Sequence, residues 1–402
     1  VGGPGRLEVT AGRNIDLGVS GGIVSRGDLD NANLPRGGAD VVVTAAAGPN
    51  GVDYAGALTR LAAALASADP DRRDAALWQA RWLSGEAALA PESAAAVVAA
   101  VAGLPAAERD ARVRALLYTA LKVSGRDAND PASPHAGDFA RAYAALETLF
   151  PGIEAGAYSG EFKLLASRIK TERGGGIDLM QPGGDLVVGL ANTPAALVAV
   201  GGNALGVVAA SGGAVRGFAR DDLLVNQSRI LTVAGGDVLL WSSAGDIDAG
   251  KGKKTASAVP PPVVKIDSQG RVTQELQGAA TGSGIGALST GGVAAGDVDL
   301  VAPRGTVNAG DAGIRAGNLN IAAAVVLGAD NISVSGSSTG TPVADTGAIT
   351  AASSSANSGD GAVGDASAAL ADTLAEAARA AEELKQSLKP TFISAEVVGR
   401  GE

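Results

Sequence analysis

The fold is indicated most clearly by the stretch Gly296-Asp297-Val298-Asp299-Leu300 and the similar stretch Gly236-Asp237-Val238-Leu239-Leu240. In each unit a glycine and a polar residue precede two apolar residues that are separated by one position. Residues i and i+2 of a strand point to the same side, so the two apolar side chains share one face. Glycine allows the chain to turn with positive φ at the start of the unit. Each unit therefore predicts a short strand that begins at a turn.

Similar units recur along most of the chain. They are found at 12–17, 176–179, 184–188 and 317–321, and several are followed by a second short strand that ends at a glycine, as in 245–250 and 305–310. This repetition predicts a mainly β fold, a parallel β-helix whose coils stack about 4.8 Å apart. Antiparallel hairpins in a sandwich or barrel are the alternative, although hairpin turns such as Asn50-Gly51 are scarce.

The composition suits thin coils packed with small side chains. The chain has 58 glycines, 17 prolines, 46% hydrophobic residues and only 3% aromatic residues. It has no cysteine, which excludes disulfides and cysteine-bearing metal or redox sites. The net charge of -10 argues against nucleic-acid binding, which needs a basic surface. No apolar run is long enough to predict a transmembrane helix.

Residues 52–151 interrupt the repeats and predict helices. Ala and Leu dominate this segment, and Leu58 and Leu61 fall on one helical face. Proline and glycine punctuate it at intervals of one helix length. We therefore expect coils at 1–51, an α-helical insertion at 52–151, and further coils at 152–350.

Two more segments depart from the repeats. A Pro-rich loop near 251–263 is expected to leave the coils and to rejoin them at Val264-Lys265-Ile266. At the end of the chain, 351–364 is rich in Ser, Ala and Gly and predicts a flexible linker. Residues 365–389 predict a C-terminal helix, and 390–402 alternate like a terminal strand.

The expected C-terminal helix carries a narrow apolar seam with heptad spacing. Its leucines are Leu370, Leu374, Leu384 and Leu388. Such a seam packs against another helix or another apolar surface. Two interpretations remain open, namely packing along the β-helix and docking onto another copy or another surface chain.

Acidic pairs are the foremost candidates for chemistry, because paired carboxylates cleave glycosidic bonds. The pairs are Asp221/Asp222, Asp246/Asp248 and Asp297/Asp299. In the last two pairs the aspartates flank an inward apolar residue, which is also the solvated alternation of an ordinary coil. We therefore expect no catalytic, cofactor-binding or metal-binding residues, and no enzyme.

Two aromatic residues and the single histidine stand apart from the repeats. Trp78 and Trp82 lie four positions apart on one expected helix and are either core residues or an exposed clamp for glycan. His135 lies between prolines and glycine, so we expect it in a solvent-exposed loop.

The order of the segments resembles the C-terminal region of filamentous-haemagglutinin-type exoproteins. The similar stretches are 162–184, 236–255, 301–314 and 392–402. The resemblance implies a right-handed parallel β-helix, export through an outer-membrane two-partner-secretion transporter, and roles in adhesion, aggregation or biofilm formation. It implies no catalytic residue and no cofactor.

Together these patterns predict a secreted or surface-attached bacterial scaffold or adhesin, associated with the outer membrane. Its expected partner is the transporter, and cell-surface glycan is a candidate ligand. Two alternatives remain, an assembly or anchoring module at the end of a long exoprotein and a polysaccharide-active β-helix. Because the chain opens at Val1 inside a repeat, we expect a piece of a longer protein, with any signal peptide upstream.

Overall fold

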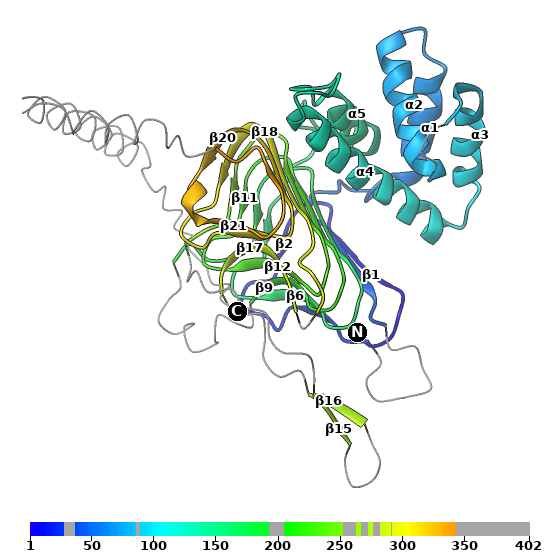
Figure 1. Cartoon of the computed structure of the whole chain (residues 1–402). Helices are drawn as coiled ribbons and strands as arrows, with labels where there is room; N and C mark the ends of the chain where they lie inside the picture. Colours follow the sequence, from blue (N-terminus) through cyan, green and yellow to red (C-terminus); the bar gives the residue numbers. More distant parts are fainter. Residues whose placement is uncertain are drawn as a thin grey trace, which may run out of the picture. The chain divides into compact units, whose positions relative to one another are not determined.

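A computed structural model describes most of the first 342 residues. The described ranges are 1–27, 37–85, 89–192, 205–251, 282–290 and 292–342, together with the backbone of 263–266 and 272–275. Within them, a parallel β-helix carries an insertion of five helices (Figure 1). The predicted linker, C-terminal helix and terminal strand, including Leu370, Leu374, Leu384 and Leu388, lie outside the described residues.

The β-helix has three faces. The first face stacks β1 (Arg6–Thr10), β4 (Asp40–Thr44), β7 (Ile177–Gln181), β10 (Val215–Ala219), β13 (Val238–Ser242), the first halves of β18 (Val298–Asn308) and β20 (Leu319–Leu327), and β22 (Ser338–Thr339). The second face stacks β2 (Ile15–Asp16), β5 (Phe162–Lys163), β8 (Leu186–Val187), β11 (Leu223–Leu224), β14 (Ile247–Asp248) and the second halves of β18 and β20. The third face stacks β3 (Ile23–Ser25), β6 (Arg168–Thr171), β9 (Gly206–Ala209), β12 (Arg229–Val233), β17 (Gly284–Leu288), β19 (Ile314–Ala316) and β21 (Ile332–Val334), the last preceded by the 3-10 turn η2 (Ala329–Asn331).

Inward side chains of successive coils form continuous columns. On the second face, Leu186 pairs in parallel register with Leu223, and Leu223 with Ile247. All three side chains are fully buried in one apolar core that runs through the coils. Burial of apolar surface contributes about 25 cal/mol per Å², so these columns hold the coils together. The prediction of a mainly β, parallel β-helix is confirmed.

The glycines that open the repeated units form a column at one corner. A Cβ on Gly236 would overlap the carbonyl oxygen of Gly213, and a Cβ on Gly296 would overlap that of Gly236. Neither Gly236 nor Gly296 has a positive φ. The reason expected from the sequence was therefore wrong at these two positions. Glycine is needed there because successive coils approach too closely to admit a side chain.

The insertion lies between β4 and β5. Its helices are α1 (Tyr54–Leu65), α2 (Pro70–Ser84), α3 (Pro91–Ala102), α4 (Ala106–Asn129) and α5 (Ala140–Leu149). Asp53 caps α1 by accepting a hydrogen bond from the Gly56 amide, and Asp69 caps α2 in the same way. Proline occupies the first turn of α2 and of α3, where no intrahelical amide donor is required.

The excursion between β14 and β17 differs from the expectation. The segment expected to rejoin the coils becomes β15 (Val263–Ile266), which pairs antiparallel with β16 (Val272–Glu275) and forms a hairpin. The coil resumes only at β17, which pairs in parallel with β12. An alternation of apolar and polar residues fits any half-buried strand, so it does not specify which strand becomes the partner.

Candidate functional site

The insertion covers the outer surface of the first face of the β-helix. The outward side chains Met180, Phe218, Trp241 and Val301 come from four successive strands and are fully buried. They share one apolar cluster with side chains of the helices. These strands are thus buried on both sides, by the core of the β-helix on one side and by the insertion on the other.

Trp241 is the aromatic centre of this contact. Its ring makes edge-to-face contacts with Phe139 and Tyr143, at centroid distances of 6.2 and 5.9 Å. Its indole nitrogen donates a hydrogen bond to the Ser243 hydroxyl at 2.9 Å. A buried tryptophan whose N–H has an acceptor is a stable packing element. This side chain therefore fastens α5 to the coils.

A buried ionic cluster lies beneath the middle of α4. The Asp178 carboxylate on β7 accepts hydrogen bonds from Arg114 of α4 at 2.8 Å and from Arg216 of β10 at 2.7 and 2.9 Å. The side chains of Asp178 and Arg114 are each 5% exposed. Arg216 also lies over the ring of Tyr118, whose hydroxyl donates to the Leu179 carbonyl. Burial raises the pKa of Tyr118 well above its ordinary value.

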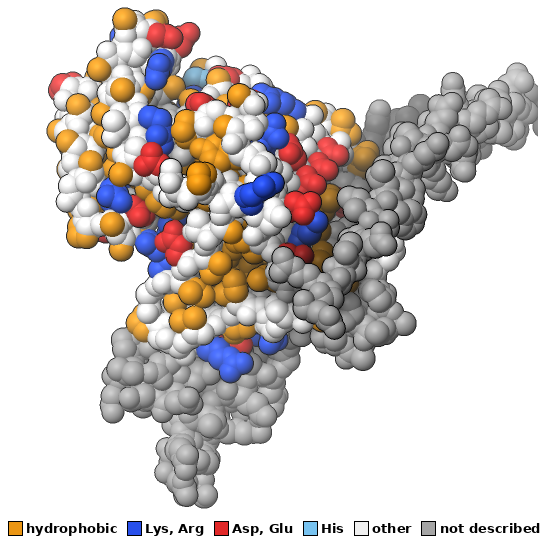
Figure 2. All heavy atoms as spheres, turned by 180° about the vertical axis from the view of Figure 1, so that it is seen from behind, with side chains coloured by type: hydrophobic (Ala, Val, Ile, Leu, Met, Phe, Trp, Pro, Cys, Tyr) orange, Lys and Arg blue, Asp and Glu red, His pale blue; other side chains and the backbone are white. Residues whose placement is uncertain are grey.

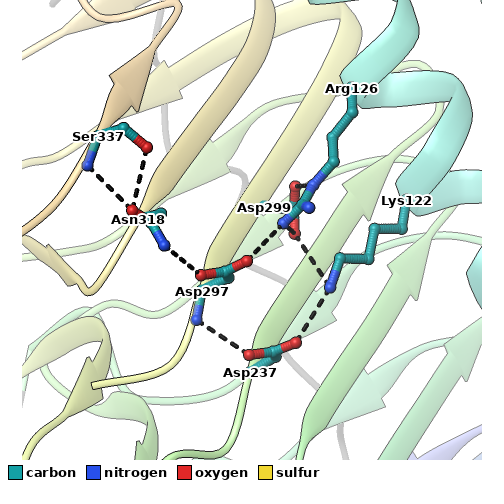
Figure 3. Close-up of polar contacts among 7 residues, drawn as sticks. All are labelled: Lys122, Arg126, Asp237, Asp297, Asp299, Asn318 and Ser337. Carbon is teal, nitrogen blue, oxygen red and sulfur yellow. Dashed lines mark hydrogen bonds and ion pairs between the residues drawn. The ribbon is translucent and has the colours of Figure 1, made fainter. Parts of the chain in front are cut away.

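A second ionic cluster lies further along α4 (Figure 3). Arg126 binds Asp299 of β18 through Nε at 2.6 Å and binds Asp297 through Nη2 at 2.9 Å. Lys122 binds Asp237 at 3.0 Å and lies 3.7 Å from Asp299. Two basic side chains from one helix thus form ion pairs with three carboxylates from two neighbouring coils.

The pair Asp297/Asp299 is therefore not the solvated alternation that the sequence suggested. Asp299 is fully buried, because α4 lies directly over it. Burial raises the pKa of Asp299, and its bond to Arg126 opposes the rise. Burial also acts on Asp297, but hydrogen bonds from Asn318 and Arg126 outweigh it and lower that pKa. Both carboxylates are engaged in holding the insertion.

A ladder of carboxylates follows the corner before the second face. The amide of Asp222 donates to the carboxylate of Asp185, and the amide of Asp246 donates to the carboxylate of Asp222. The amide of Thr306 on the next coil donates to Asp246 in turn. Each carboxylate thus joins its own coil to the next coil. Acidic side chains also gather in a column on one side of the molecule (Figure 2).

The remaining acidic candidates bind nearby groups as well. Asp248 accepts a hydrogen bond from the Gly250 amide, and Asp221 pairs with Arg220 at 3.2 Å. Burial raises the pKa of Asp222, the hydrogen bond from the Asp246 amide opposes this, and the charges of Asp185 and Asp246 add to the rise. In the described part of the chain no three acidic or histidine side chains are grouped to hold a metal ion.

The other sequence candidates lie in the insertion. His135 lies in the loop between α4 and α5 and is partly buried, with its side chain 38% exposed and Nδ1 3.5 Å from Asp138. Trp78 and Trp82 of α2 are half-buried and pack edge to face at 5.9 Å. Arg141 covers the ring of Trp78 and Arg81 covers that of Trp82. Each indole thus already has one face covered by an arginine, which favours the core interpretation over the glycan clamp.

The docking surface of α4 escaped the sequence reasoning, although two signals point to it. Arg114, Tyr118, Lys122 and Arg126 recur every four residues, which places polar and basic side chains on one helical face. In the coils, the run Leu239-Leu240-Trp241 is apolar at successive positions, which is typical of a strand buried on both faces. Together these signals predict a helix packed on a sheet.

Part of the chain matches a known protein family. Residues 235–343 match the family described as filamentous haemagglutinin family outer membrane protein. The matched region spans β13 to β22, and so includes Asp237, Asp297 and Asp299. No curated protein and no solved structure matches the chain. Among the helices that the structure describes, none combines the length and apolar character needed to cross a membrane.

Proposed function

We propose that this chain is a section of a secreted or surface-attached bacterial scaffold that mediates attachment, aggregation or biofilm formation. The observation that carries the proposal is that the matched family region coincides with coils of a parallel β-helix. A stack of coils presents a long, repeating surface, which suits adhesion through many weak contacts. The family description as an outer membrane protein supports the cell-surface location in this proposal.

The proposal includes a non-enzymatic role. Carboxylates that act as general acid and base need free access to a substrate. Here Asp299 is buried under α4, and Asp222 and Asp246 accept hydrogen bonds from backbone amides of the next coil. These contacts account for the acidic residues through folding alone.

The principal experiment places the protein in its native cells. Deletion of the gene is expected to reduce adhesion to surfaces, aggregation or biofilm mass, and the wild-type gene is expected to restore the lost property. Protease treatment of intact cells should degrade the protein. The proposal would be refuted if the protein were found only in the cytoplasm, or if the deletion changed none of adhesion, aggregation and biofilm mass.

Export is a separate part of the proposal, with an outer-membrane two-partner-secretion transporter as the partner. Crosslinking during secretion, followed by purification of the chain, is expected to recover that transporter. Loss of the transporter should leave the chain inside the cell. Normal surface display in cells without any such transporter would contradict this part and leave the adhesive role to be judged separately.

Two alternative functions have direct tests. For an assembly or anchoring module, replacement of Leu370, Leu374, Leu384 and Leu388 by alanine should release the protein from the surface or change its oligomeric state. For a polysaccharide-active β-helix, the purified chain should cleave a polysaccharide, and Asp246→Asn with Asp248→Asn should abolish the cleavage. Absence of cleavage by the wild type across a panel of bacterial and host glycans would exclude the second alternative.

A further inference from the structure

The contacts of α4 follow the order of the coils in the chain. Its N-terminal turn meets the first coil and its last residue meets the seventh strand of the first face. In the first half of α4, Ala107 contacts Arg6 on β1, Arg114 contacts Asp178 on β7, and Tyr118 contacts Leu179 on β7 and Arg216 on β10. In the second half, Lys122 contacts Asp237 directly before β13, Arg126 contacts Asp299 on β18, and Asn129 contacts Asn320 and Ile321 on β20.

The dimensions of the helix and of the stack agree. From Ala107 to Asn129 an α-helix rises about 33 Å at 1.5 Å per residue. From the first to the seventh strand of the first face the stack rises about 29 Å at about 4.8 Å per coil. One turn of helix, about 5.4 Å, therefore passes roughly one coil. A slightly tilted helix meets each new coil in turn.

The helix precedes most of the coils that it touches. Its partners on β7 to β20 lie later in the sequence, by 61 residues for Leu179 and by 192 for Ile321. Helices form from local contacts within about a microsecond, whereas pairing between distant strands is slow. The insertion is thus able to fold before the later coils are in place.

The partners along α4 also differ in kind. Arg114 meets a carboxylate that is shared with Arg216, Lys122 and Arg126 meet three carboxylates, and Asn129 meets an amide and a carbonyl. A coil placed one level too low would set the neutral Asn320 opposite Arg126 and move Asp299 toward Lys122. Arg126 would then lose its hydrogen-bonded contact with Asp299, so the order of side chains on α4 distinguishes the correct stacking level.

From these observations we infer that α4 is an intramolecular template on which coils β7 to β20 assemble in chain order. The helical insertion would thereby set the level of each coil as that coil forms. A clasp that closes after the coils have stacked would show the same final contacts, so folding kinetics distinguish the two roles.

Single thiols report when each coil forms, because the native chain has no cysteine. Ala45, Ala219 and Ala302 are fully buried; Ala45 directly follows β4, Ala219 ends β10, and Ala302 ends the first half of β18. In three variants of the full chain, Ala45→Cys, Ala219→Cys and Ala302→Cys, pulse labelling of the thiol during refolding measures the time of burial. The template predicts burial in the order 45, 219, 302.

The decisive comparison adds Arg126→Ala to each thiol variant, with Arg112→Ala as the matched control. Arg112 lies on the same helix, its side chain is 50% exposed, and within the described part of the chain it forms an ion pair with Glu108 rather than with a coil. The template predicts that Arg126→Ala delays burial at position 302 several-fold and leaves position 45 unchanged, because the interaction is made before the coil closes. Arg112→Ala should change neither.

Two results would overturn the inference. If Arg126→Ala speeds unfolding but leaves burial at position 302 as fast as in the parent, the helix is a clasp that closes last. If all three positions are delayed equally, the insertion acts on folding as a whole and does not order the coils. Should Arg126→Ala fail to fold, Arg126→Lys keeps the charge while removing the two-pronged contact, and the same comparison applies.

Discussion

Arg126 and Asp299 are 173 residues apart in the chain, and their side chains meet at 2.6 Å. The carboxylate is fully buried, whereas the arginine side chain is 41% exposed. The pair joins the insertion to β18, a strand of the sixth level of the first face. The pair explains why an aspartate stands within the buried first half of β18.

We predict that Arg126→Ala lowers the free energy of unfolding by about 3 kcal/mol, because it leaves a buried carboxylate without its main partner. This loss of stability is at the lower end of the range of about 3–5 kcal/mol for breaking a buried ion pair, because Lys122 remains 3.7 Å from Asp299. Urea denaturation followed by tryptophan fluorescence measures it. Arg112→Ala, on the exposed face of α4, is expected to cost less than about 1 kcal/mol.

The partner substitution tests the same interaction. Adding Asp299→Leu to Arg126→Ala is expected to recover part of the lost stability, because leucine carries no charge that burial without a partner would penalise. If the double variant is no more stable than Arg126→Ala alone, the cost of the single substitution does not arise from the stranded carboxylate.

Asp222→Asn is predicted to stabilise the protein at neutral pH. The amide oxygen can still accept the hydrogen bond from the Asp246 amide, while repulsion from Asp185 and Asp246 is removed. We expect a gain on the order of 0.5 kcal/mol, typical of relieving a like-charge pair between adjacent strands. Asn318 shows that an asparagine can take this role, because its amide oxygen accepts a hydrogen bond from the Ser337 amide of the next coil. Urea midpoints measure the difference.

The gain should depend on pH in one direction. The folded-state pKa of Asp222 is raised, so ionisation disfavours the folded state, and the stability of the parent falls as the pH rises from about 4 through the raised value. The asparagine does not titrate. The advantage of Asp222→Asn should therefore vanish near pH 3 and be complete near pH 7. Asp40→Asn is the control. Asp40 pairs in register with Arg6 and accepts a hydrogen bond from the Gly176 amide, so we expect no gain in stability from this substitution.

Gly125→Ala is predicted to destabilise the protein, although alanine is the better helix former by about 1 kcal/mol. A Cβ at this position would stand 2.5 and 3.2 Å from the two methyl groups of Val301. Valine has little rotamer freedom with which to yield, so overpacking of about 1–3 kcal/mol outweighs the helical gain. In a Val301→Ala background the same substitution should be neutral or stabilising. A loss of stability that persists in that background would rule out this clash.

Two leucines in neighbouring coils should respond differently to truncation. Leu300 points into the core and is fully buried, whereas Leu327 is 50% exposed. Leu300→Ala is expected to cost about 3 kcal/mol, and Leu327→Ala less than about 0.5 kcal/mol. Thermal or urea unfolding measures both. Equal costs would mean that Leu327 is covered in the native protein by a part of the chain that the structure does not describe, or by a partner.

The repeat of glycine, polar and apolar residues was sufficient to predict the coils. Its period of two is a property of the strand itself, and identical units can bury their apolar faces only by stacking. The glycine column was recognised from the same pattern, yet for the wrong reason. Close approach of Gly236 to the carbonyl of Gly213 depends on two coils at once, and no single unit contains it.

The contacts of Asp297 and Asp299 with α4 could not be predicted from the local sequence pattern. Asp297 and Asp299 read as solvated positions because an outward side chain on an isolated coil faces water. The same reasoning failed at Val263–Ile266, where alternation predicted a strand correctly but not its antiparallel partner. In both cases the local residues were read correctly, and a segment distant in sequence changed their surroundings.

The sequence by itself therefore determined the parallel coils and the presence of helices in the insertion, because hydrophobic periodicity and helix-starting residues are local. Only the tertiary structure decided that α4 lies across the first face and buries Asp178 and Asp299 there. Contacts that span 64 to 173 residues depend on the geometry of the whole stack. The match between helix rise and coil spacing appears only when both are assembled.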